Sequence, residues 1–200
     1  MSRYRTDNSD NDSVVNSDDK SDDKSIKTYD NILSIDIGIK NLGWAYFNND
    51  LLTFDIYTID DKKKSKESVV MHRCKKVEEF FKQFEDKPID YIVIERQVNN
   101  NTMAMELMYA ITMKALTITE NIFIFDPKLK FTFYNEEYTT KNKLHKKRSV
   151  EKAREYINTN YENMVETFES HDKLDDISDA INQGLTYIDM LRKSKQTKHK

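Results

Sequence analysis

Cysteine is nearly absent from this 200-residue sequence, in which Cys74 is the single example. One cysteine cannot form an intramolecular disulfide, and with only four scattered histidines it cannot complete a zinc cage. Long apolar runs are missing as well, because none approaches the ~20 residues needed to cross a bilayer and the N-terminus lacks an apolar signal core. We therefore expect a soluble, intracellular protein in a reducing compartment, with no membrane contact.

Glycine is also scarce, since the chain contains only Gly38, Gly43 and Gly184. The first two lie close together. The Asp-x-Gly sequence at Asp36 to Gly38 is shared with the actin-like ATPases. Those proteins are much longer and need further glycine-rich loops to bind nucleotide phosphates. With a single glycine left over, the sequence argues against that class and predicts no nucleotide cofactor.

Charge is distributed unevenly, although the net charge is only −3. Residues 1–30 contain five basic residues and eight aspartates, so 5 − 8 = −3 and the remainder is neutral overall. Residues 1–28 offer little for a core to bury, and we expect them to form a disordered acidic leader. We expect one compact domain over residues 29–192 and a basic tail over residues 193–200.

Residues 31–47, NILSIDIGIKNLGWAYF, predict a buried strand that ends in a carboxylate. The period of two in a strand places Ser34 and Asp36 on one face and the isoleucines around them on the other. Gly38 then makes a turn that keeps the approach to Asp36 free of side chains. A second strand follows from Leu42, and residues 51–59 predict a third. The alternative is that Asp36 is an ordinary turn residue.

The fourth predicted strand, residues 89–95, is apolar and also ends in a carboxylate, Glu95. The alternative here is a glutamate that leaves the sheet for solvent. A helix from about residue 99 to 120 follows, apolar on nearly every side, and then a short strand over residues 122–125. The excess of apolar residues on this helix is explained by core packing or, alternatively, by a dimer contact.

The last predicted helix, residues 172–191, has an apolar stripe and an acidic flank. Asp176 and Asp179 are three residues apart and therefore neighbours on this flank, with Asp175 beside them. Acidic residues in a first turn also favour the helix dipole, so a role in helix stability alone is the alternative.

Between Lys128 and Arg154 the chain carries nine basic residues and three glutamates, so 9 − 3 = +6, with aromatic residues interleaved. This mixture suits DNA backbone phosphates and stacked bases, although a solvated helix face also explains it. The predicted DNA-binding residues of this segment are Lys141, Lys143, Lys146, Lys147 and Arg148.

Asp36, Glu95, Asp176 and Asp179 would repel one another strongly if they met at one sheet edge. Two like charges ~4 Å apart cost about 4 kcal/mol at an effective dielectric of 20. A divalent cation removes this objection, and oxygen ligands without cysteine or histidine suit Mg²⁺, with Mn²⁺ able to substitute. Two such ions in one site cleave phosphodiesters in many enzymes. We therefore predict these four residues as metal ligands and catalytic residues.

The predicted strand order fits an α/β fold of the ribonuclease H-like type, with a five-stranded mixed sheet whose first three strands are antiparallel, flanked by helices. Within it, IDIGIKNLGWA, VIERQ and LDDISDA resemble, in that order and separation, the RuvC-type Holliday junction resolvases, most closely their poxvirus branch. The three motifs together carry the resemblance, which covers residues 31 to about 190.

The resemblance implies a Mg²⁺-dependent, homodimeric endonuclease that cuts four-way DNA junctions symmetrically. In a poxvirus it would resolve replicated genome concatemers in the host cytoplasm. Carried over by motif, the acids are Asp36, Glu95, Asp176 and Asp179, with Asp175 as the competing candidate for the third, and Lys40 would contact phosphate. A ribonuclease H acting on RNA–DNA hybrids and a junction-binding module without cleavage are the alternatives.

Overall fold

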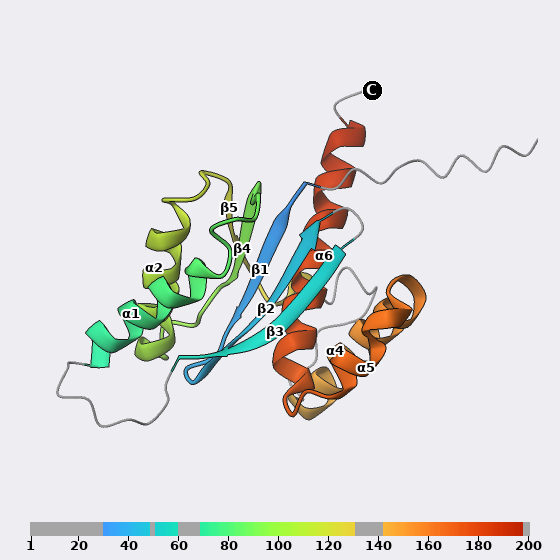
Figure 1. Cartoon of the computed structure of the whole chain (residues 1–200), viewed down its shortest axis with the longest axis horizontal. Helices are drawn as coiled ribbons and strands as arrows, with labels where there is room; N and C mark the ends of the chain where they lie inside the picture. Colours follow the sequence, from blue (N-terminus) through green and yellow to red (C-terminus); the bar gives the residue numbers. More distant parts are fainter. Residues whose placement is uncertain (1–29, 49–50, 60–68, 131–141, 198–200) are drawn as a thin grey trace, which may run out of the picture.

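The computed structural model describes residues 30–48, 51–59, 69–130 and 142–197. A five-stranded mixed sheet forms the centre of the molecule (Figure 1). The strand order is β3-β2-β1-β4-β5, in which the first three strands along the chain pair antiparallel and β1, β4 and β5 pair parallel. The strands are β1 (Ile32–Ile37), β2 (Asn41–Asn48), β3 (Leu51–Thr58), β4 (Tyr91–Glu95) and β5 (Ile122–Phe125). This is the sheet that the sequence predicts.

Helices cover both faces of the sheet (Figure 1). Helices α1 (Val69–Lys82) and α2 (Thr102–Ala115) lie on one face, and the other face carries α4 (Asn142–Asn160), α5 (Val165–Glu169) and α6 (Leu174–Thr197), with a 3₁₀ turn, η1 (Glu162–Met164), before α5. Helix α2 is shorter than predicted, while α6 continues past residue 192, where the sequence suggests a basic tail. Among the described residues, no helix is both long enough and apolar enough to span a membrane.

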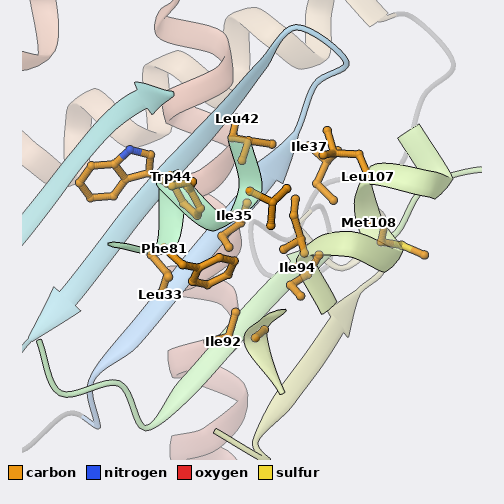
Figure 2. Packing of buried hydrophobic residues seen from close by; sticks show 14 of the residues in the cluster. Leu33, Ile35, Ile37, Leu42, Trp44, Phe81, Ile92, Ile94, Leu107 and Met108 are labelled. Atoms are coloured by element: carbon orange, nitrogen blue, oxygen red, sulfur yellow. The ribbon is translucent and has the colours of Figure 1, made fainter. Parts of the chain in front are cut away.

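The alternation of side chains along β1 builds two separate apolar layers. Leu33, Ile35 and Ile37 pack toward α1 and α2 (Figure 2), whereas Ile32 packs toward α6. The same rule applies to β4, so the sheet is buried on both faces as expected for parallel strands. Ser34 and Asp36 therefore lie on the α6 face, as the period of two predicts.

The turn after β1 is tight for a steric reason. The N–H of Gly38 donates to the carbonyl oxygen of Asn41 at 2.9 Å. A Cβ on Gly38 would lie 2.7 Å from that same oxygen, which is closer than real Cβ contacts come. Glycine is therefore required here by the approach of the Asn41 carbonyl.

Two glycines allow α6 to lie close against β2. A Cβ on Gly43 would overlap the backbone carbonyl of Asp176, and a Cβ on Gly184 would overlap the ring of Phe47. Gly43 is also the cross-strand partner of Asp36. The first turn of α6 is thereby brought directly over the end of β1.

Candidate active site

Two neighbouring parallel strands deliver Asp36 and Glu95 to the same edge of the sheet. Ile35 on β1 pairs with Ile94 on β4, and each carboxylate is the next residue of its strand. Asp36 is buried, with 8% of its surface exposed, and Glu95 is half-buried. Because side chains one residue after a register pair point to the same face, the two carboxylates converge.

Helix α6 adds Asp176 and Asp179 to these two carboxylates. Burial raises the pKa of Asp36 well above its ordinary value, and the charges of Glu95, Asp179 and Asp176 raise it further. Burial likewise raises the pKa of Glu95. The four carboxylates predicted from separate motifs therefore lie within electrostatic reach of one another.

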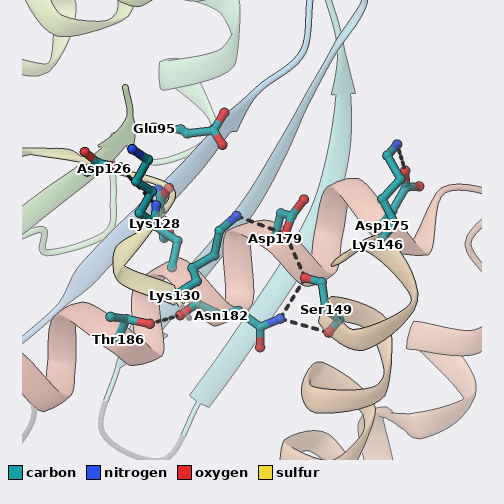
Figure 3. Close-up of polar contacts among 12 residues, drawn as sticks. Glu95, Asp126, Lys128, Lys130, Lys146, Ser149, Asp175, Asp179, Asn182 and Thr186 are labelled. Atoms are coloured by element: carbon teal, nitrogen blue, oxygen red, sulfur yellow. Dashed lines mark hydrogen bonds and ion pairs between the residues drawn. The ribbon is translucent and has the colours of Figure 1, made fainter. Parts of the chain in front are cut away.

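Lys130, which follows β5, inserts its ammonium group among these carboxylates. Its Nζ lies 2.9 Å from Oδ1 of Asp179, and Figure 3 shows the side chain pointing toward that aspartate. Burial alone would lower the pKa of Lys130, but the charges of Asp179, Glu95 and Asp36 outweigh this effect and raise it. Lys130 is therefore a charged part of the site.

In the sequence, Lys130 is one member of the basic run between Lys128 and Arg154, with no local indication that it belongs to the site. A signal was present, because Lys130 follows the third parallel strand by five residues and the carboxyl ends of parallel strands share one sheet edge. Nothing in the local sequence distinguishes it from the neighbouring Lys128, which is why the structure was needed.

Asp175 and Asp176 have different surroundings. Asp175 forms an ion pair with Lys146 of α4, whose side chain is 61% exposed. Although burial opposes the effect, this contact lowers the pKa of Asp175. Burial and the charge of Asp175 instead raise the pKa of Asp176, and the charge of Asp176 acts on Asp36. The geometry thus favours Asp176 as the member of the acidic group.

A buried glutamine holds α6 against the ends of both strands. The Nε2 group of Gln183 donates to Oγ of Ser34 at 3.1 Å, to the carbonyl of Ile35 at 3.1 Å and to the carbonyl of Val93 at 3.2 Å. These partners lie one or two residues before Asp36 and Glu95. The amide therefore links β1, β4 and α6 immediately below the carboxylates, a role that sequence analysis did not foresee.

The predicted DNA-binding residues differ in position and exposure. Lys146 and Lys147 are exposed on α4 and line a groove between α4 and the start of α6, where Lys147 lies 3.6 Å from Glu151. Arg148 is half-buried, and Lys40 is exposed in the turn after β1. The remaining two, Lys141 and the side chain of Lys143, lie outside the described residues.

The acidic group suits a divalent metal ion in charge and donor chemistry. Four ionised carboxylates and one ammonium group give −4 + 1 = −3, so Lys130 leaves negative charge uncompensated. Hard oxygen donors are those that Mg²⁺ prefers. Among the described residues, however, no group of three or more Asp, Glu, His or Cys side chains is arranged so that it could hold a metal ion without further ligands. A site completed by water and substrate phosphate fits these observations.

The fold defines the class of protein first. The fowlpox virus resolvase, in a complex with its substrate Holliday junction DNA, superposes with a TM-score of 0.58 at 21% identity, over 80% of this chain and 98% of that chain. The RuvC protein of Thermus thermophilus, also in a complex with a Holliday junction substrate, superposes with a TM-score of 0.52 at 12% identity, over 81% and 96%. The chain thus has the ribonuclease H-like fold of the RuvC-like resolvases.

Its sequence then identifies the family. Residues 30–193 match the poxvirus A22 protein family, and the chain belongs to it. No individual curated protein matches the chain by sequence.

The raised pKa of Asp36 predicts that Asp36→Asn changes the free energy of unfolding in a pH-dependent way when no metal is bound. The folded protein holds the Asp36 proton more tightly than the unfolded chain, so stability is lost as the pH rises from the ordinary aspartate pKa of 3.8 through the folded pKa. Asparagine carries no charge and avoids this loss. In urea unfolding with chelator, we expect the variant to gain stability over the natural protein as the pH rises from about 4 to about 7.

Asp86→Asn, which changes an exposed aspartate after α1, serves as the control for this measurement. A stability difference between Asp36→Asn and the natural protein that stays constant across the pH range would contradict the prediction.

Proposed function

We propose that this chain is a metal-dependent endonuclease that resolves four-way DNA junctions by paired, symmetric phosphodiester hydrolysis. The observation that carries the proposal is the convergence of Asp36, Glu95, Asp176 and Asp179 at one sheet edge in a chain of this family. We assign the activity to residues 29–192. Its substrates in the cell would be replication or recombination intermediates such as genome concatemers in the host cytoplasm.

The four carboxylates would hold the metal, for which we propose two Mg²⁺ ions per site, with Mn²⁺ able to substitute. Bound there, the ions would activate a water molecule and stabilise the leaving oxygen. Lys130 holds Asp179 through Oδ1 and reduces the repulsion between the carboxylates. Gln183 links α6 to β1 and β4 through its hydrogen bonds to the carbonyl groups of Ile35 and Val93.

The basic face of α4 would bind the DNA backbone. Lys146 and Lys147 are exposed next to the start of α6, so a phosphate bound there lies beside the acidic group. Arg148, Lys143 and Lys141 extend the positive charge along this segment, and Lys40 adds to it from the turn after β1. Backbone contacts of this kind read shape and charge more than sequence.

The exposed face of α2 would form the homodimer contact. Tyr109 and Met113 of α2 expose 57% and 66% of their surfaces, and Leu116, directly after the helix, exposes 51%. All three lie on the side of the sheet away from α4 and α6. One chain contributes one acidic group and hence one cut, whereas a four-way junction requires two cuts related by two-fold symmetry. A two-fold dimer matches that substrate.

Asp36→Asn tests the proposed chemistry directly. We expect cleavage of a synthetic four-way junction in Mg²⁺ to fall by about 100-fold or more, because one charged group of the site is lost. Junction binding in Ca²⁺ should remain close to that of the natural protein, and chelator should stop cleavage by the natural protein. An RNA–DNA hybrid in the same assay distinguishes the ribonuclease H alternative.

Normal cleavage by Asp36→Asn would remove this residue from the proposed site. Junction binding without any cleavage by the natural protein would instead identify a binding module, and preferential cutting of the hybrid would identify a ribonuclease H.

Neutralising the basic helix should weaken binding in a salt-dependent way. For the triple variant Lys146→Gln, Lys147→Gln and Arg148→Gln, we expect the slope of log affinity against log salt to become shallower by about 2 to 3, because each lost phosphate contact removes about 0.9. A filter-binding titration at several salt concentrations measures this slope. The charge-matched control replaces three lysines of α1, Lys75, Lys76 and Lys82, by glutamine.

An unchanged slope in the α4 variant, or an equal change in the α1 control, would exclude α4 as the DNA-binding surface.

Met113→Glu should separate the dimer, because it places a charge in the apolar face of α2. We expect the mass measured by light scattering to fall by about half at micromolar concentration. In a junction-cleavage assay, paired cuts should decrease more than single nicks. Leu144→Glu, which adds the same charge to an exposed apolar position on α4, is the control for the mass measurement. A Met113→Glu protein that stays dimeric would exclude this face as the interface.

A further inference from the structure

Only one oxygen of the Asp179 carboxylate is held by neighbouring side chains. Oδ1 accepts a hydrogen bond from Oγ of Ser149 at 2.7 Å and another from Nζ of Lys130 at 2.9 Å. Within the described part of the chain, no hydrogen bond reaches Oδ2. The two donors therefore fix the rotation of the carboxylate and leave the second oxygen available.

The direction of the Ser149 hydroxyl proton is itself determined by Asn182. The Asn182 Nδ2 group donates to the backbone carbonyl of Ser149 at 2.8 Å and to its Oγ at 2.9 Å (Figure 3). A hydroxyl has one proton, and here its oxygen already accepts from the amide. The proton must therefore point to Asp179, and the backbone carbonyl contact prevents the amide from being reversed.

This arrangement connects two helices with separate proposed tasks. Ser149 lies on α4, directly after Lys146, Lys147 and Arg148, and it is buried with 8% of its surface exposed. Asn182 and Asp179 lie on α6, three residues apart. The helix that would bind the DNA backbone thus also holds a member of the acidic group through a buried hydrogen bond.

We propose that Ser149 is a positioning residue that orients Asp179 for metal binding, a role that rests on the proposed function. By holding Oδ1 from α4, it presents Oδ2 to the acidic group and spares Asp179 the entropy of ordering when the metal binds. It does not touch the reacting atoms. Loss of the hydroxyl should weaken metal binding while leaving DNA binding intact.

Ser149→Thr and Ser149→Val form a matched pair, since the two side chains have the same shape and differ in the hydroxyl. Mn²⁺ binding to the dimer without DNA, followed by electron paramagnetic resonance, should be about 10- to 100-fold weaker for valine than for threonine. The Mg²⁺ concentration for half-maximal cleavage should shift in parallel, and excess Mg²⁺ should restore most of kcat. Junction affinity in Ca²⁺ should be equal for the two variants.

Ser178→Ala is the control for removal of a buried serine hydroxyl. Ser178 lies on α6 next to Asp179 and is fully buried, and its hydroxyl has no hydrogen-bond partner among the residues that the structure describes. We expect this variant to bind Mn²⁺ like the natural protein.

Equal Mn²⁺ affinity for the threonine and valine variants would overturn the proposal, as would a natural protein that binds no Mn²⁺. Failure of the proposed function has a different signature, in which the natural protein binds Mn²⁺ and distinguishes the two variants but does not cut junctions.

Discussion

The structure depends on how repulsion among four carboxylates at one sheet edge is balanced. Burial and the neighbouring charges raise the pKa of Asp36, which means that the fold opposes its ionisation. Lys130 offsets part of this repulsion by contacting Asp179. The remainder must be balanced by packing elsewhere, because a domain of this size is stable by only ~5–15 kcal/mol.

That packing is concentrated where α6 crosses the sheet. Gly43 and Gly184 allow close contact on the β2 side, and the amide of Gln183 satisfies backbone carbonyls of β1 and β4. Apolar residues of α6 such as Ile177 and Ile181 complete the contact as fully buried core. The position of the acidic flank is therefore a consequence of helix–sheet packing, in which the carboxylates themselves contribute destabilisation. Sites that sacrifice stability for function in this way are common.

Helix α4 contacts both the acidic group and the groove beside α6. Its exposed lysines face the groove beside α6, and its buried Ser149 reaches Asp179. In our proposal, consecutive residues of one helix thus carry the charge that binds DNA and the hydrogen bond that orders a carboxylate. A rigid element that does both can hold the phosphate and the acidic group in a constant relation, which is what efficient phosphodiester cleavage requires.

Local patterns in the sequence are sufficient to predict the sheet, and they single out the four acids that the structure brings together. Alternation places Asp36 and Glu95 at strand ends on one face, and the three-residue spacing pairs Asp176 with Asp179, because strand and helix periods depend only on backbone geometry. Only the tertiary structure distinguishes Asp175 from Asp176. Lys146 of α4 forms an ion pair with Asp175, whereas the charge of Asp176 acts on Asp36. The tertiary structure also decided that Lys130, one of many lysines, is buried among the carboxylates. The polar groups below them, Ser149, Asn182 and Gln183, have no local signature, because a buried hydrogen bond is defined by a partner that lies far away in the chain.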